Sequence, residues 1–166
     1  MVAQAAVQDV ALYPQQWDFV HDERRFVAFV GGRGSGKTYS GSWKAVRRAM
    51  EPGLGIIAAP DFPMLEFGAK RTFIERLEEM RLPFVPNTQK GLITIPSTGA
   101  EVRFATLENE SRVRGPNYSW GWADEFEYLT DRGVWKALKG SSRHGGNPQL
   151  FGTSTPKGRR LAYDDW

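Results

Sequence analysis

An eight-residue run in the first quarter of the chain carries the clearest chemical pattern. It fits G-x-x-x-x-G-K-[ST], follows an apolar stretch and precedes a helical pattern. Glycines let the backbone turn tightly, so that its N–H groups form a nest for an anion. A lysine at the seventh position reaches the β- and γ-phosphates, and a hydroxyl at the eighth completes a Mg²⁺ shell. The pattern predicts an ATP-binding phosphate loop, with a plain glycine-rich turn as the alternative; its residues are Gly31, Gly32, Arg33, Gly34, Ser35, Gly36, Lys37 and Thr38.

A pair of acidic residues, Asp124 and Glu125, supplies the second part of this chemistry. They end a short run, Trp120–Ala123, that is less aliphatic than most buried strands. We expect a strand beside the phosphate-loop strand to deliver Asp124 to the metal and Glu125 to polarise the attacking water. A solvated acid pair at a helix start is the alternative. Glu127 is the less favoured base, because it lies beyond the strand end.

Alternating strands and helices are needed to bring these groups together. Buried strands are expected at Phe26–Val30, Leu54–Ala59, Tyr118–Ala123 and Gln149–Gly152, and a hairpin at Leu92–Ile95 with Glu101–Ala105. Helices are expected at Pro14–Val20, Lys37–Met50, Pro63–Leu82 and Asp131–Leu138, the last with Asp131 as N-cap. This order predicts an α/β fold with a mostly parallel sheet, helices on both faces and the hairpin as an insertion.

Length and composition limit the possible classes of protein. The chain has 166 residues, 40% hydrophobic and 25% charged, which predicts one globular domain over residues 1–166 with a flexible segment at 1–12. No run is long and apolar enough to span a membrane, and we find no signal peptide pattern. The absence of cysteine excludes disulfides and thiolate zinc sites and fits a reducing cytoplasm. The net charge of +3 permits contact with phosphate backbones without demonstrating it.

Three segments in order, GGRGSGKT, RVRGPNYSWGWADE and GTSTPKG, resemble the ATPase domain of the large terminase subunit of tailed bacteriophages. The resemblance runs from about Pro14 to the end of the chain. It implies a RecA/ASCE-like P-loop NTPase that hydrolyses ATP with Mg²⁺ and drives double-stranded DNA into a procapsid in the host cytoplasm. The implied partners are the portal and the small terminase subunit. The implied assembly is a ring of identical subunits, with a monomer in isolation as the alternative.

The same resemblance suggests roles for side chains around the phosphate loop. Gln16 corresponds to an adenine contact, with Gln15 as the alternate and a merely polar helix face as the competing reading. Arg33 corresponds to an arginine that stabilises charge on the γ-phosphate or changes its contacts with nucleotide state, with a solvated loop arginine as the alternative. Arg114 corresponds to a finger that acts on the neighbouring subunit's nucleotide, with Arg112 as the competitor. A DNA contact is the other role open to Arg112 and Arg114.

The segment after the last expected strand resembles the family's coupling motif. Thr153, Ser154 and Thr155 would link the state of the γ-phosphate to movement, and Pro156 would end the strand. An ordinary Ser/Thr turn is the alternative. The basic residues that follow, Lys157, Arg159 and Arg160, are expected to face either DNA or solvent.

The chain departs from the family pattern at its C-terminal end. The family continues into a lid and a nuclease, whereas this sequence stops just past the coupling motif and has no second carboxylate cluster. We therefore expect lid and nuclease to be absent. Two other functions stay open: a different P-loop DNA translocase or helicase, and a nucleotide-binding assembly module without turnover.

Overall fold

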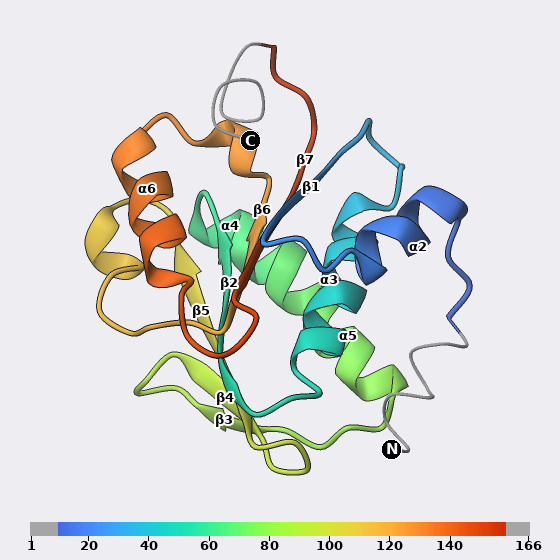
Figure 1. Ribbon diagram of the computed structural model, residues 1–166, viewed down its shortest axis with the longest axis vertical. Helices are drawn as coiled ribbons and strands as arrows, with labels where there is room; N and C mark the ends of the chain where they lie inside the picture. Colours follow the sequence, from blue (N-terminus) through green and yellow to red (C-terminus); the bar gives the residue numbers. More distant parts are fainter. Residues whose placement is uncertain (1–9, 159–166) are drawn as a thin grey trace.

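The structure is a computed structural model in which residues 10–158 are described (Figure 1). A seven-stranded sheet crosses the molecule in the order β1-β7-β6-β2-β5-β4-β3. The first five strands of that order are parallel, and β4 and β3 add an antiparallel edge. The strands are β1 (Phe26–Val30), β2 (Gly53–Ala59), β3 (Val85–Asn87), β4 (Leu92–Ile95), β5 (Ala100–Thr106), β6 (Trp120–Asp124) and β7 (Gln149–Ser154).

Helices cover both faces of the sheet, as the α/β pattern predicts. In Figure 1, α2, α3 and α5 lie on one side of the sheet and α6 on the other. The helical segments are α2 (Pro14–His21), α3 (Lys37–Arg48), α4 (Phe62–Met64), the π-helix η1 (Leu65–Lys70), α5 (Arg71–Glu79), the 3₁₀ turns η2 (Glu110–Arg112) and η3 (Phe126–Tyr128), and α6 (Arg132–Ser141). The predicted N-cap is confirmed, because the Asp131 side chain accepts a hydrogen bond from the Gly133 N–H at 2.7 Å.

Two apolar clusters hold these layers together, and strand alternation divides residues between them. In β2, Ile57 and Ala59 belong to the cluster under α3 and α5, whereas Ile56 and Ala58 belong to the cluster under α6. This alternation follows from the period of two in a strand, which sends successive side chains to opposite faces. A strand apolar at every position is therefore buried on both sides, as expected for a parallel sheet with helices on both faces.

Several predicted boundaries shift in the structure. Strand β7 extends through Thr153 and Ser154, and β6 begins at Trp120 because Tyr118 forms only an isolated bridge. The predicted helix 63–82 is wrong as one continuous α-helix. It divides into α4, the π-helix η1 and α5, and α5 ends at Glu79. The short strand β3, which contains Pro86, was not predicted.

The expected position of the acidic strand is also wrong. Strand β6, which ends at Asp124, is not beside the phosphate-loop strand β1, because β7 pairs with both and lies between them. The carboxyl end of β7 therefore stands between the two halves of the predicted site.

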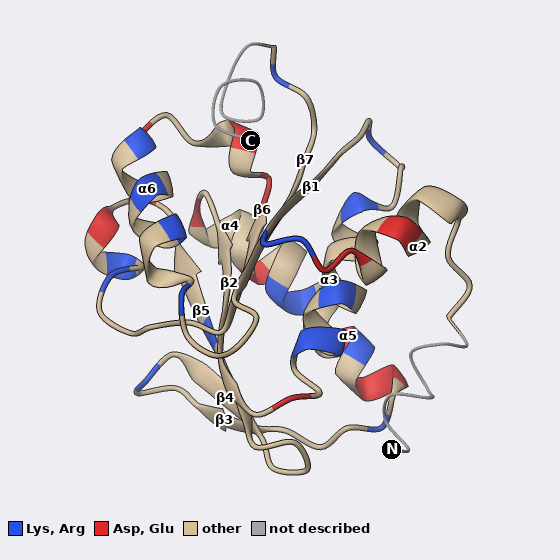
Figure 2. Cartoon of the chain, in the orientation of Figure 1, with Lys and Arg blue, Asp and Glu red and all other residues tan. Residues whose placement is uncertain are grey.

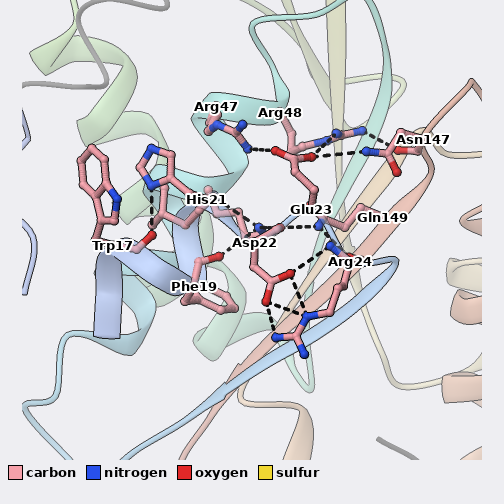
Figure 3. Close-up of polar contacts among 12 residues, drawn as sticks. Trp17, Phe19, His21, Asp22, Glu23, Arg24, Arg47, Arg48, Asn147 and Gln149 are labelled. Carbon is pink, nitrogen blue, oxygen red and sulfur yellow. Dashed lines mark hydrogen bonds and ion pairs between the residues drawn. The ribbon is translucent and has the colours of Figure 1, made fainter. Parts of the chain in front are cut away.

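A buried polar junction fixes α2 to α3 and β7 (Figure 3). Lys44 of α3 is fully buried, and its Nζ donates to the carbonyl oxygens of Phe19, Val20 and Asp22 at 3.0, 3.3 and 2.6 Å. The Gln149 amide of β7 donates to the carbonyl of Asp22 at 2.7 Å and to that of Arg24 at 2.8 Å. A lysine thus satisfies the terminal carbonyls of α2, where a helix favours a cation.

Some expectations fall on residues beyond those described. Of the predicted flexible segment 1–12, only residues 10–12 are described, and they have no regular secondary structure. Arg159 and Arg160 lie outside the described residues, so their predicted exposure to DNA or solvent has no structural counterpart. Between residues 10 and 158, no helix is long and apolar enough to cross a membrane.

Candidate nucleotide-binding site

The phosphate loop joins β1 to α3 through two left-handed glycines. Gly34 and Gly36 have φ of 78° and 73°, values that residues with a Cβ rarely adopt. Within residues 10–158, the N–H groups of Gly32, Arg33, Gly34 and Gly36 have no hydrogen-bond acceptor. The Ser35 hydroxyl, buried in the same loop, also lacks a partner there. These free donors provide the groups that an anion would need.

The helix α2 contacts this loop through Gln16. Its Nε2 donates to the Ser35 carbonyl at 3.0 Å, and its Oε1 accepts from the Tyr13 N–H at 3.0 Å. A Cβ added at Gly36 would lie 2.3 Å from Gln16 Nε2. The Gln16 side chain is buried with both ends of its amide in use, whereas Gln15 is exposed. Gln16 therefore holds α2 against the phosphate loop.

A short line of hydrogen bonds connects the loop to the end of β6. The Thr38 hydroxyl lies 3.3 and 3.2 Å from the two carboxylate oxygens of Asp124. Thr153 of β7 donates to Asp124 Oδ1 at 2.6 Å and accepts from the Trp122 indole N–H at 2.7 Å. Residues from three elements thus meet at one buried carboxylate.

Glu125 forms an ion pair with the lysine of the phosphate loop. Lys37 Nζ is 3.2 Å from Glu125 Oε1, and both side chains are mostly buried. Glu125 Oε2 accepts from the Thr155 N–H at 3.2 Å and from the Ser154 hydroxyl at 3.4 Å. Glu125 has a left-handed backbone with φ of 51°, which is uncommon outside glycine and turns the chain sharply after β6.

Burial raises the pKa of the Asp124 carboxyl to about 6. The hydrogen bond from Thr153 opposes this rise, and the neighbouring Glu125 charge adds to it. Burial disfavours the charged carboxylate more than Lys37 and the two threonine hydroxyls stabilise it, so a further cation nearby would favour the carboxylate. Together with the Thr38 hydroxyl, it offers hard oxygen donors, the type that Mg²⁺ prefers, so the residues present fit this metal. Within the described part of the chain, no group of three or more His, Asp or Glu residues forms a metal cluster.

The predicted arginines lie apart from these contacts. Arg33 is exposed at the tip of the phosphate loop. Arg114 is exposed and forms an ion pair with Glu110 at 2.5 Å, while Arg112 is exposed at the end of η2. Among residues 10–158, neither Arg112 nor Arg114 has a hydrogen bond or ion pair to the phosphate loop. Glu127, the less favoured base, is buried, and its N–H donates to the Ser154 hydroxyl at 3.1 Å.

Two contributors to the site were missed by sequence reasoning. In the sequence Trp122 is only an atypical residue of a buried strand, whereas in the structure its indole orients Thr153. The π-helix η1 also approaches the site, because a Cβ added at Gly68 would lie 3.8 Å from Asp124 Oδ2. Gly41 of α3 gives an indirect signal: a Cβ there would lie 2.5 Å from the Trp122 ring, so a small residue is needed opposite a large one.

A strand–glycine loop–helix unit facing an acidic pair across an intervening parallel strand defines a P-loop NTPase of the RecA/ASCE class, as the sequence predicts. The chain belongs to the family described as terminase large subunit, T4likevirus-type, N-terminal, which it matches over residues 28–166. The predicted family is thereby confirmed.

Solved structures of phage large terminases share the fold. The large terminase from a thermophilic bacteriophage has a TM-score of 0.82 and 13% identity, over 95% of this chain and 42% of that protein. The complex of the same phage's terminase with ADP has a TM-score of 0.82 and 12% identity, over 94% of this chain and 42% of that protein. The ATPase domain of the Thermus phage P74-26 large terminase has a TM-score of 0.77 and 20% identity, over 96% of this chain and 70% of that domain. The chain thus spans less than half of the first of these terminases, and no curated protein sequence matches it.

Proposed function

We propose that this chain is the ATP-binding and ATP-hydrolysing core of a phage motor that moves double-stranded DNA into a procapsid. It would act in the cytoplasm of the bacterial host, with the portal and the small terminase subunit as partners and as part of a ring of identical subunits. The supporting observation is the meeting of Lys37 and Thr38 with Asp124 and Glu125 at one place. Family membership narrows the class of motor from P-loop ATPases in general to terminases.

The phosphate loop and the Thr38–Asp124 pair would bind the triphosphate and its metal. The free N–H groups of the loop and the start of α3 favour phosphate oxygens. Thr38 and Asp124 would hold Mg²⁺, which neutralises charge that develops on the β- and γ-phosphates. Arg33, exposed on the loop, would add positive charge near the γ-phosphate.

The Lys37–Glu125 ion pair links nucleotide binding to Glu125, the proposed base. Phosphate oxygens compete with the Glu125 carboxylate for the Lys37 ammonium, because both are anions within its reach. Once Lys37 turns to phosphate, Glu125 is free to accept a proton from the attacking water. Its other oxygen stays bonded to Ser154 and Thr155, so the base is coupled to the predicted coupling motif.

Gln16 holds α2 against the loop and keeps hydrogen-bonding capacity for adenine. Its bonds to Ser35 and Tyr13 use one N–H of Nε2 and one lone pair of Oε1, so an adenine contact would use the second N–H and the second lone pair. Gln15, which is exposed, remains the alternate adenine contact.

Two substitutions test Lys37 as the phosphate-binding residue and Glu125 as the base. Lys37→Ala should weaken binding of ATP·Mg²⁺, whereas Glu125→Gln should retain binding but stop sustained phosphate release. Lys70→Ala serves as a control, because Lys70 is paired with Glu66 on η1 and takes no part in the proposed chemistry. Binding is measured by calorimetry, and turnover by phosphate release with and without duplex DNA. Unchanged turnover in Glu125→Gln would reject Glu125 as the base. If the unmodified chain binds ATP but releases no phosphate in either condition, it is an assembly module without turnover.

A further inference from the structure

A hollow lies away from the nucleotide site, between α6 and the loop that leads into β6. Its volume is about 440 Å³. We call it the α6 groove, and its lining consists of Arg114, Gly115, Pro116, Asn117, Lys136, Ala137, Gly140, Ser141 and Arg143.

The charged side chains that line the α6 groove are all positive. Its lining contains Arg114, Lys136 and Arg143 and no Asp or Glu. Figure 2 shows further Lys and Arg positions at successive turns of α6. Arg143 is held in place by a hydrogen bond from its Nε to Asn117 Oδ1 at 2.8 Å. In the described part of the chain, neither Lys136 nor Arg143 lies within ion-pairing distance of a carboxylate, so both charges face the groove uncompensated.

Small residues keep the space between these cations open. A Cβ added at Gly115 or Gly140 would meet no atom within 4 Å. The lining has no aromatic side chain on which a base could stack, which is how proteins commonly hold exposed bases. An open, cationic and non-aromatic hollow fits the phosphates of a backbone better than a nucleoside.

We propose that the α6 groove binds the backbone phosphates of duplex DNA. The choice of DNA rests on the proposed motor function, whereas the location rests on the groove itself. Lys136 and Arg143 would each neutralise a phosphate, and Arg114 would add a third contact where its pair with Glu110 permits. Because the contacts are to phosphates, binding is independent of base sequence and falls steeply with salt.

Gly140 permits a test by charge without disturbing the packing. It lies on α6 with open space beyond its Cα, so Lys, Gln and Glu can replace it, and all three are better helix formers than Gly. Measured by anisotropy with a labelled 30-base-pair duplex in 0.1 M salt, Gly140→Lys should bind about eightfold tighter than Gly140→Gln. Gly140→Glu should bind more weakly than Gly140→Gln, which is its neutral isostere. Equal affinities in the three variants would overturn the groove as a DNA site.

The salt dependence gives a second, independent measurement. Lys136→Gln should lower the slope of log affinity against log salt by about 0.9, and equally for two duplexes of unrelated sequence. Arg71→Gln on α5, across the sheet from the groove, should leave that slope unchanged. If only Arg71→Gln lowers the slope of log affinity against log salt, the DNA binds on the α5 side of the sheet and not in the α6 groove. ATP binding, measured in the same variants, should be unaffected; if the unmodified chain binds no ATP, the motor function fails independently of the groove.

Discussion

The direction of hydrogen bonds around Thr153 is determined by one tryptophan. An indole N–H can only donate, so the bond from Trp122 occupies a lone pair of the Thr153 oxygen. The Thr153 proton is then directed to Asp124, 2.6 Å away. A residue that looks like an ordinary core aromatic therefore holds the buried carboxylate in position. Trp122 is a positioning residue, since it touches neither the proposed metal nor the phosphates.

We expect Trp122→Phe to reduce turnover more than nucleotide affinity. Loss of the N–H frees the Thr153 hydroxyl to rotate, which costs about 1 kcal/mol of unfolding free energy. Metal-dependent phosphate release should fall at saturating ATP, while ADP binding without metal stays close to that of the unmodified chain. Trp43→Phe is the matched control, because the buried Trp43 N–H has no partner among the described residues. Equal kinetic effects in both variants would contradict an orienting role for Trp122.

We expect Gly36→Ala and Gln16→Ala to be coupled. Gly36→Ala places a Cβ 2.3 Å from Gln16 Nε2 and forces a left-handed φ of 73° on alanine, at a cost of about 1–2 kcal/mol for the backbone alone. Gln16→Ala removes the clash but not the backbone strain, so the double variant should lose less stability than the sum of the single ones. Denaturant unfolding of the four proteins gives the coupling energy. Additive losses would mean that Gln16 does not press on the loop.

Sequence reasoning predicts the proximity of individual residues where a motif specifies them. Lys37, Thr38, Asp124 and Glu125 are near one another in the structure, as the two patterns require. Gln16 and Trp122 act through partners 19 and 31 positions away, so their side-chain contacts have no local pattern to reveal them.

Among the elements, helical periodicity identifies Pro63–Leu82 as helical but does not reveal its interior. A π-helix adds only a small change to the spacing of apolar residues, so α4, η1 and α5 look like one helix in sequence. Strand β3 was missed because it is three residues long and contains a proline, which normally argues against a strand. It is tolerated because β3 lies at the edge of the sheet.

The junction of α2 with α3 should make stability depend on pH through Lys44. Burial lowers the pKa of this lysine from 10.5 to about 7. Between these values the unfolded chain holds a proton that the folded chain has released, so raising the pH favours folding. We expect the unfolding free energy of the unmodified chain to rise relative to that of Lys44→Met as the pH goes from 7 to 10, by at most about 1.4 kcal/mol per pH unit.

Chemical denaturation of both proteins at several pH values measures this difference. Loss of the ammonium leaves the Asp22 carbonyl bonded to Gln149, so the junction keeps part of its hydrogen bonding. Stability curves that stay parallel from pH 6 to 10 would show that Lys44 titrates normally in the folded protein.

For the whole molecule, the fold class follows from the alternation of strands and helices, but the order of strands does not. Nothing in the local sequence says that β7 enters between β1 and β6, since β7 pairs with β1 from more than a hundred residues away. The same is true of the α6 groove, where Arg114 and Arg143 come together only in the folded chain.

Assembly gives a test of Arg114 that a single subunit cannot. Arg114 is exposed and makes no contact with its own phosphate loop within residues 10–158, as a finger for a neighbouring site requires. We expect mixtures of Arg114→Ala and Glu125→Gln subunits to regain phosphate release, because some interfaces combine an intact arginine with an intact base. Activity is measured in oligomers whose mixed composition is verified by native mass spectrometry. Absence of rescue there would assign Arg114 to DNA alone.

The place of β7 has a mechanical consequence. At one end, the Ser154 carbonyl accepts a hydrogen bond from the Gly31 N–H, and Thr153 and Ser154 contact the acidic pair. At the other end, Gln149 is bonded to the carbonyls just after α2. Sliding this strand along its own axis therefore strains both ends together. A displacement that begins where the triphosphate would lie is transmitted to the carbonyls that follow α2, at the opposite end of β7.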